Sequence, residues 1–201
     1  WDDPAIAETN PGVDLPDLPV VPVNRSDDSG TTENFTEYLA EAGGDAWPYE
    51  PSGTWPRSGT QSGQQNAGMV STLRAAEGTI GYLDASQVTD ELGTVAVRVG
   101  DGYVPFSPEA AATVVDASPP ASGASDTRLI IELDRATDAP GAYPVVLISY
   151  TVACTRYESE EKADAVRELL TYIASEDGQE RVASPDVAGA APISADLRSR
   201  V

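Results

Sequence analysis

The sequence predicts an α/β protein, because strand-like runs are interspersed with segments of helical periodicity. Apolar residues at helical spacing predict helices after the polar turn at residues 29–32, around residues 66–76 and at residues 159–175. Runs rich in valine and isoleucine predict strands at residues 18–24, 79–83 and 145–153. The order strand, turn, helix near the N-terminus, followed by a second helix and strand, indicates a globular domain with connecting loops.

Proline and glycine limit the first elements. A short helix is expected at residues 5–9, directly after Pro4. Pro19 and Pro22 interrupt the first strand, and proline donates no backbone hydrogen bond. We therefore expect this strand to have a free edge, or to be an extended linker leading into a strand. The helix that follows is expected to end at residues 43–44, two glycines.

A long loop and a hairpin are predicted in the middle of the chain. Residues 45–66 are rich in Gly, Ser, Pro and Gln, and Trp47 and Trp55 are expected to pin this loop to the core. Residues 95–99 and 103–106 flank a Gly-Asp-Gly turn, which predicts a β-hairpin. Tyr82 and Tyr103 are candidates for a binding cleft, although core packing is the better explanation for both.

The C-terminal part combines exposed connections with one buried strand and one helix. Residues 116–126 are small, polar and proline-containing, and are expected to form an exposed loop. By composition, residues 145–153 are expected to be a buried strand. Residues 159–175 form an amphipathic helix whose apolar face consists of Ala163, Val166, Leu169, Leu170 and Ile173.

Composition and charge exclude several classes of function. The net charge of −21 argues against binding to nucleic acid, whose phosphates would meet a repulsive surface. Surface charge is screened over about 8 Å at physiological salt, so a local anion site is still compatible with this charge. No apolar run approaches the roughly 20 residues of a membrane helix. No export signal opens the sequence, and we expect any such signal to lie upstream or to have been removed.

The sequence carries little of the chemistry that enzymes use. It has no histidine, which removes the commonest acid-base residue and the commonest zinc ligand. Cys154 is the only cysteine, and is expected to be a buried free thiol rather than the partner of a cysteine elsewhere. Carboxylate pairs and runs at residues 2–3, 27–28 and 158–161 are expected to be solvated rather than to bind metal. We therefore predict no catalytic activity and no cofactor.

One segment, residues 25–32 (Arg-Ser-Asp-Asp-Ser-Gly-Thr-Thr), has the features of an anion site. The first N–H groups of a helix lack partners and carry partial positive charge. Gly30 allows an oxyanion to approach the backbone, and Ser29 and Thr31 add hydroxyl donors. Arg25 offers a planar fork suited to two oxygens of one tetrahedral anion. Asp27, two residues beyond, is placed to orient that guanidinium.

The same residues also fit an ordinary helix start. Asp28 or Ser29 would then simply cap the helix. On spacing alone, this structural explanation is the better one.

The octet resembles the Arg-Ser/Ala-Asp-x-Ser-Gly-Thr-Thr/Ser signature of bacterial phosphate-binding proteins of the ABC phosphate uptake system. Further blocks resemble that family in the same order, at residues 1–7, 10–12, 15–16, 55–66, 78–83 and 143–145. The resemblance thus covers nearly the whole chain and favours the anion site over the simple helix cap.

The resemblance implies a periplasmic-binding-protein type II-like fold with two lobes and a hinge, of which this chain is mostly the second lobe. Residues 1–141 would form the second ligand-binding lobe, incomplete at its N-terminus, and residues 142–201 would return to the first lobe. The implied phosphate ligands are Arg25, Ser29, Gly30 and Thr31, with Asp27 as the partner of the arginine. The family binds phosphate noncovalently and delivers it to the membrane permease of an ABC importer.

The resemblance also implies what is missing or unusual. The family's first lobe supplies a second helix start and a carboxylate that accepts a phosphate proton, so this chain alone is expected to discriminate poorly between oxyanions. Asp28 replaces a small residue of the family. The strand at residues 145–153 would lack neighbours, and we expect the chain to be a fragment or to dimerise over that strand.

The implied location is the extracellular face of the membrane or the periplasm, with a lipid anchor in the full-length protein. The alternatives are a receptor for another tetrahedral oxyanion, an interaction module with a degenerate binding fold, and a hydrolase that uses the anion site as a phosphoryl pocket.

Overall fold

The computed structural model describes residues 1–184 and 186–200. The chain folds into two compact units, Trp1–Gly93 and Thr94–Val201. The predicted lobes, residues 1–141 and 142–201, concern the ligand-binding architecture and stay a prediction. Among the described residues, no helix is long and apolar enough to cross a membrane.

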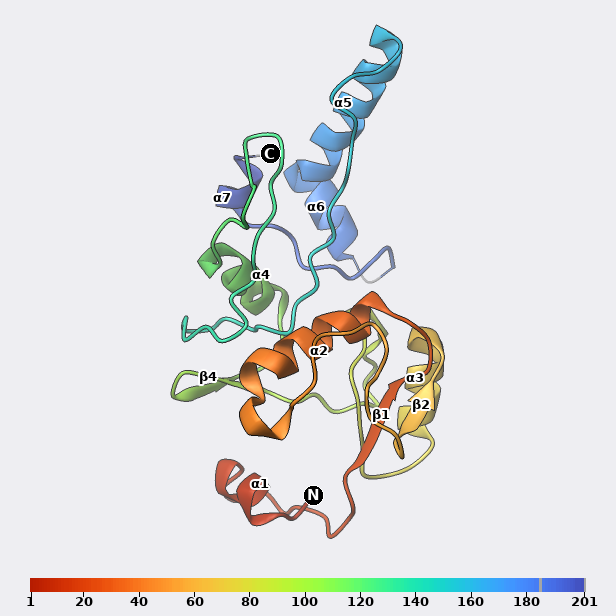
Figure 1. The fold of residues 1–201 in the computed structure, drawn as a ribbon, viewed down its shortest axis with the longest axis vertical. Helices are drawn as coiled ribbons and strands as arrows, with labels where there is room; N and C mark the ends of the chain where they lie inside the picture. The colour runs from red at the N-terminus through yellow and green to blue at the C-terminus, as the bar shows by residue number, and fades with distance from the viewer. Residues whose placement is uncertain (185, 201) are drawn as a thin grey trace. The chain divides into compact units, whose positions relative to one another are not determined.

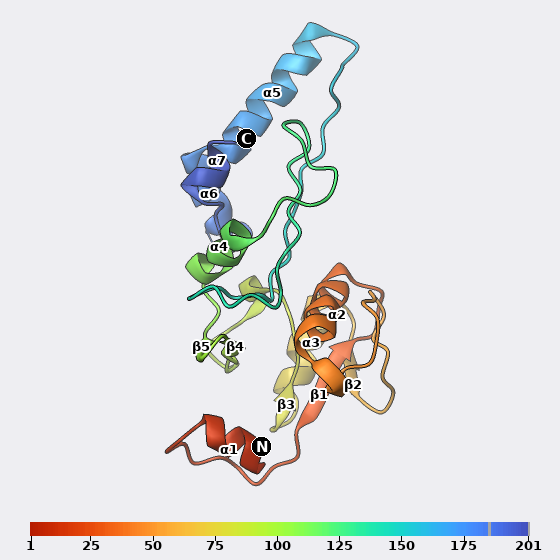
Figure 2. The same cartoon turned by 60° about the vertical axis from the view of Figure 1, so that its left-hand side comes forward.

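The first unit is built on a three-stranded parallel sheet (Figures 1 and 2). Its strands are β1 (Val21–Arg25), β2 (Gln61–Gly63) and β3 (Thr79–Ile80), in the order β2-β1-β3. Its helices are α1 (Pro4–Thr9), α2 (Gly30–Ala42), α3 (Gln65–Arg74) and the short 3-10 turns η1 (Gly44–Ala46) and η2 (Ala85–Gln87). The predicted α/β character, the helix at residues 5–9 and the order strand, turn, helix are confirmed.

The expectation that the first strand has a free edge is wrong, because β1 is the central strand. Pro22 is tolerated in this central strand because only one of the two neighbouring strands pairs with it. Pro22 pairs with Ile80 of β3, whereas the pairing with β2 begins one residue later, at Val23. Proline therefore faces only one ladder, where its missing N–H removes at most one bond.

The core of the first unit lies between the sheet and α3. Val23 of β1 packs with Met69 and Leu73 of α3, at 2%, 0% and 9% exposure, and Leu83 and Leu92 pack against this cluster. The spacing of Met69 and Leu73 by four residues places both on one face of the helix. Trp47 is buried, as expected for a residue that pins the long loop.

The described residues of the second unit form a hairpin and four helices. The hairpin consists of β4 (Val97–Val99) and β5 (Gly102–Val104), which confirms that prediction. The helices are α4 (Pro108–Ala117), α5 (Glu160–Ala174), α6 (Glu176–Ala183) and α7 (Ala195–Arg198). The predicted helix at residues 159–175 is thus confirmed as α5, capped by Ser159. α4 was not predicted, although Ser107 caps it and Pro108 occupies its first position, as is typical of helix starts.

Two predictions for the second unit are wrong. Residues 145–153 form no strand, and Leu147, Tyr150 and Val152 are 55%, 46% and 90% exposed. The segment has strand composition, but a strand requires a partner, and no other described segment pairs with it. Cys154, expected to be buried, is exposed, because it follows directly on this unpaired segment.

β2 and α3 approach each other closely at Gly63. A Cβ atom at Gly63 would lie 2.3 Å from the carbonyl carbon of Gly68, in the first turns of α3. Since backbone atoms cannot yield as a flexible side chain can, glycine is required here. This contact fixes how closely the first turn of α3 packs against β2.

We expect Gly63→Ala to lower the free energy of unfolding by about 2 kcal/mol, as overpacking of a dense contact does. Gly93→Ala is the matched control, because a Cβ atom at Gly93 meets nothing within 4 Å; its effect is expected to stay within about 0.5 kcal/mol. Urea denaturation of the two variants measures both values. Equal stability of the two variants would contradict the close approach of β2 and α3.

Candidate functional site

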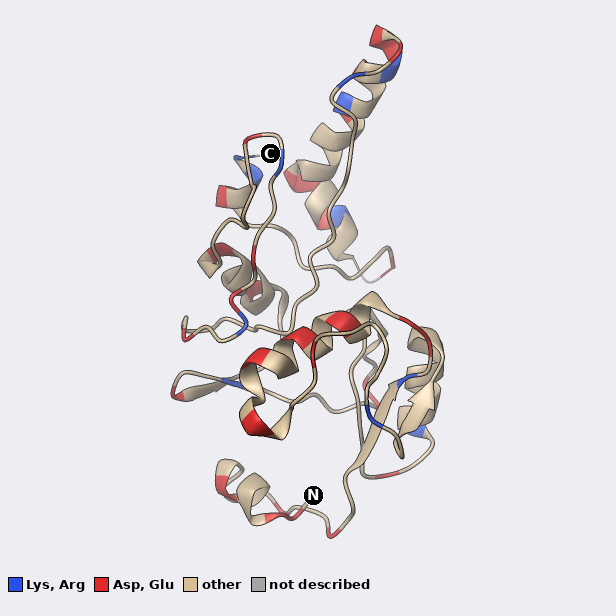
Figure 3. Cartoon of the chain, in the orientation of Figure 1, with Lys and Arg blue, Asp and Glu red and all other residues tan. Residues whose placement is uncertain are grey.

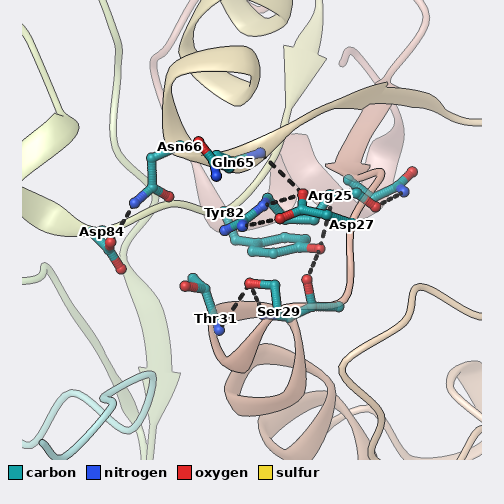
Figure 4. A network of polar contacts seen from close by, with 10 residues as sticks. Arg25, Asp27, Ser29, Thr31, Gln65, Asn66, Tyr82 and Asp84 are labelled. Carbon is teal, nitrogen blue, oxygen red and sulfur yellow. Dashed lines mark hydrogen bonds and ion pairs between the residues drawn. The ribbon is translucent and has the colours of Figure 1, made fainter.

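The predicted anion-binding residues lie where β1 ends and α2 begins (Figure 4). Arg25 is the last residue of β1, and Gly30 is the first residue of α2. In parallel sheets, ligands bind beyond the carboxyl ends of the strands, and this turn occupies that edge. The four residues between the two elements bring the arginine side chain and the helix start into one place.

Arg25 is held by a two-pronged ion pair with Asp27. The arginine Nε donates to Asp27 Oδ1 over 2.9 Å, and the terminal nitrogen Nη2 donates to Oδ2 over 2.5 Å. The backbone N–H of Gln65, at the start of α3, donates to the same Oδ1 over 3.0 Å. Asp27 therefore fixes the guanidinium and also joins the end of β1 to the start of α3.

This pairing shifts the pKa values of both side chains. The hydrogen bonds from Arg25 and from the Gln65 N–H lower the pKa of Asp27 well below its ordinary value. The hydrogen bond to Asp27 raises the pKa of Arg25. The site therefore keeps a fixed positive charge next to a carboxylate that stays ionised.

Ser29 caps α2 with its side chain. Its Oγ accepts hydrogen bonds from the N–H groups of Thr31 and Thr32, at 3.1 and 3.4 Å. Its own N–H donates to the carbonyl of Gly53 over 2.9 Å. Ser29 is thus a helix cap, as the simpler explanation predicts. The cap occupies the lone pairs of its oxygen and leaves the hydroxyl hydrogen available to donate. Capping and anion binding are compatible at this serine, since one uses its lone pairs and the other its hydrogen.

Gly30 leaves the helix start open. Among the residues that the structure describes, none accepts a hydrogen bond from the Gly30 N–H. A Cβ atom at Gly30 would meet nothing within 4 Å, so neither packing nor backbone geometry within the chain requires glycine there. An unpaired N–H at the positive end of a helix is a donor available to an anion.

These groups line a single open pocket within the first unit. Its lining consists of Arg25, Asp28, Ser29, Gly30, Thr31, Gln65, Asn66, Ala67 and Gln87. All four residues predicted as ligands contribute to it, whereas Asp27 does not, which fits a residue that orients the arginine from behind. No group of carboxylate or thiol residues suited to a metal ion occurs in the described chain.

The second wall of the pocket was not predicted. It comes from the start of α3, where Gln65 adopts a left-handed backbone conformation with φ of 54°, and from Gln87 of η2. Gln64 occupies the N-cap position of α3, and the Asn66 amide, inside the helix, donates to the Asp84 carboxylate. A left-handed non-glycine residue is an unusual feature that often accompanies function, but it is not visible in a sequence.

Asp28 is the one acidic group that lines the pocket. Its carboxylate sits against the loop at Gly53, where a Cβ atom would lie 2.1 Å from Asp28 Oδ1. Acidic residues outnumber basic ones in the chain, and Figure 3 shows several along α2, beyond its first turn. Arg25 is the one cationic side chain among the described residues of the pocket lining, and it supplies the positive charge there next to the carboxylates of Asp27 and Asp28.

The comparison with protein families identifies the class. Residues 1–177 match the model of a family described as a PBP superfamily domain. The chain therefore belongs to this superfamily, and its mixed α/β structure with a parallel sheet is a periplasmic-binding-protein-like fold. The predicted fold class is confirmed.

Individual relatives point to one branch of that class. The chain is 28% identical over 173 residues to the phosphate-binding protein PstS 2 of Mycobacterium tuberculosis, covering 85% of this chain and 47% of the relative. It is 33% identical over 156 residues to the phosphate-binding protein PstS of Xylella fastidiosa, covering 75% of this chain and 41% of the relative. The chain resembles these phosphate-binding proteins, as predicted, and spans about half of their length or less.

We expect Asp27→Asn to destabilise the protein more at pH 7 than at pH 3. Because folding lowers the pKa of Asp27, its stabilising contribution is complete above the ordinary aspartate pKa of about 3.9. That contribution is lost as the pH falls from there toward the folded-state pKa. Thermal unfolding of the unmodified protein and of Asp27→Asn between pH 3 and pH 7 measures the difference in stability at each pH.

Asp164→Asn is the control for this prediction. Asp164 also pairs with an arginine, Arg167, but both side chains are more than 60% exposed, and such surface pairs contribute little. The control is expected to match the unmodified protein at both pH values. A cost of Asp27→Asn that does not change with pH would contradict the assigned ion pair.

Proposed function

We propose that this protein binds inorganic phosphate noncovalently through Arg25, Ser29, Gly30 and Thr31, with Asp27 supporting the arginine. The observation that carries the proposal is that a fixed guanidinium and the unpaired Gly30 N–H line the same open pocket. A tetrahedral anion with several acceptor oxygens matches this set of donors. The names of the relatives, which are phosphate-binding proteins, support the choice of phosphate.

Each group has a distinct part in this proposal. Arg25 supplies charge and two directional donors, and Asp27 keeps the guanidinium from rotating. The Gly30 N–H binds one oxygen at the helix start, where the helix dipole adds about 0.3–1 kcal/mol. The hydroxyls of Ser29 and Thr31 donate to the remaining oxygens.

The proposed protein is a receptor with two lobes. Residues 1–141 form the second ligand-binding lobe and residues 142–201 return to the first lobe, which closes over the anion by a hinge. The receptor delivers phosphate to the membrane permease of an ABC importer. It acts at the extracellular face of the membrane or in the periplasm, held by a lipid anchor.

The exposed segment at residues 145–153 requires a cover in this proposal. The side chains of Leu147, Tyr150 and Val152 are apolar or amphipathic and more than 40% exposed. Exposure of several apolar side chains within one short segment to water is unfavourable. Another part of the receptor covers them, or a second copy of the chain does so in a dimer.

Three alternatives predict different results. In an interaction module with a degenerate site, Asp28 would repel any anion. A receptor for another oxyanion would prefer sulfate or arsenate to phosphate. A hydrolase would turn over a generic phosphomonoester, which we do not expect, because Ser29 Oγ contacts only backbone N–H groups in the described chain and no base.

Calorimetric titration of phosphate and then sulfate separates the proposed receptor from an interaction module and from a sulfate receptor, and an assay with a generic phosphomonoester tests the hydrolase. We expect the complete protein that contains this chain to bind phosphate tightly, and the 201-residue chain to bind weakly and with little preference. Arg25→Ala is expected to weaken phosphate binding by about 10-fold to 100-fold, as loss of a charged hydrogen-bond donor does.

Arg74→Ala is the matched control for the titration. Arg74 pairs with Glu91 at the surface and does not line the pocket, so its removal is expected to leave the affinity unchanged. If the complete protein binds neither anion, the interaction module becomes the better proposal.

We expect Gly30→Ala to separate binding from stability. The new methyl group meets no atom of the chain, and alanine is at least as favourable as glycine in a helix, so stability changes by less than about 1 kcal/mol. The methyl group occupies the space through which an oxyanion approaches the backbone, so phosphate affinity falls by about tenfold or more. Titration and thermal unfolding of the same variant test both expectations, and unchanged affinity would place the anion elsewhere.

A further inference from the structure

We infer that the Tyr82 hydroxyl is a positioning group for the proposed anion site, because it ties the end of β1 to the first turn of α2. The backbone N–H of Arg25 donates to the Tyr82 hydroxyl oxygen over 3.1 Å. The same oxygen lies 2.8 Å from the hydroxyl oxygen of Thr32, in a second hydrogen bond. This inference rests on the proposed function.

The position of the hydroxyl is fixed by its aromatic ring. Tyr82 is 8% exposed, and its ring stacks on Phe35 of α2 with ring centroids 4.6 Å apart. Trp55 of the long loop stacks on the same ring at 5.7 Å. Burial raises the pKa of Tyr82, so the hydroxyl keeps its proton at neutral pH and is both donor and acceptor.

The two groups that Tyr82 joins are the two halves of the proposed site. Arg25 carries the charge, and Thr32 directly follows Thr31, one of the proposed ligands. Asp27 fixes the guanidinium of Arg25, and its side-chain hydrogen bonds within the described residues go to Arg25 and Gln65 and not to the first turn of α2. Tyr82 therefore sets the distance between the arginine and the Gly30 N–H, which must bind the same anion.

The core explanation accounts for the ring but not for the hydroxyl. Phenylalanine would keep the stacking on Phe35 and Trp55, yet it would leave the Arg25 N–H and the Thr32 hydroxyl without this buried partner. Unsatisfied buried groups of this kind shift to find water or new partners. Such a shift would loosen the relative placement of Arg25 and α2.

Tyr82→Phe, measured in the complete protein by calorimetric titration with inorganic phosphate, tests the inference. We expect the dissociation constant to rise by about fivefold, the effect of one hydrogen bond of ordinary strength. Tyr38→Phe is the matched control, because Tyr38 belongs to the same aromatic group through Phe35, whereas among the described residues the link from Arg25 to Thr32 is made by the Tyr82 hydroxyl. Its phosphate affinity is expected to equal that of the unmodified protein.

Double variants separate positioning from a general effect on the fold. In the Arg25→Ala background, Tyr82→Phe is expected to change phosphate affinity by less than about twofold, because there is no longer a second group to place. Thr32→Val is expected to weaken binding as Tyr82→Phe does, and the two together no more than either alone. An equal loss with and without Arg25 would overturn the inference.

The outcomes also distinguish this inference from the proposed function. If the unmodified protein binds phosphate and Tyr82→Phe binds it equally well, the inference falls and the proposed function stands. If the unmodified protein binds no phosphate, both fall.

Discussion

The ion pair between Arg25 and Asp27 is the interaction on which the candidate site depends. It places the only cationic side chain of the pocket next to a helix start, in a chain of net charge −21. Two parallel hydrogen bonds fix the guanidinium plane, and a third, from the Gln65 N–H, brings α3 to the same carboxylate. Asp27 therefore links the end of β1 to the start of α3, and the proposed anion site depends on the guanidinium that it fixes.

The sequence predicted best what local chemistry determines. The octet at residues 25–32 contains its own strand end, turn and helix cap, so the order strand, turn, helix could be predicted from these residues alone. The hairpin at Gly100-Asp101-Gly102 and the amphipathic helix α5 are local in the same sense. Residues 145–153 show the limit, because their composition favours a strand but hydrogen bonding requires a partner.

Residues that reach the site over long sequence distances were harder to predict. Gln65 and Gln87 enter the pocket through the close approach of β2 and α3 and through η2, which no periodicity reveals. The sequence favours core packing for Tyr82 over a place in the cleft, and the ring is buried and does not line the pocket, but the hydroxyl also accepts a hydrogen bond from the Arg25 N–H. A residue with two such environments cannot be assigned from its neighbours in the sequence alone.

The most direct test of the central claim is an NMR titration of inorganic phosphate into the 201-residue chain, observing backbone N–H groups and the Arg25 side chain. The account predicts the largest shift changes at Gly30 and Thr31 and at the Arg25 Nη–H groups that Asp27 does not bind, saturating together, and much smaller changes at the capped start of α5, Glu160. Changes of equal size at both helix starts, or none at Gly30, would show that the β1–α2 turn is a capped helix and no anion site.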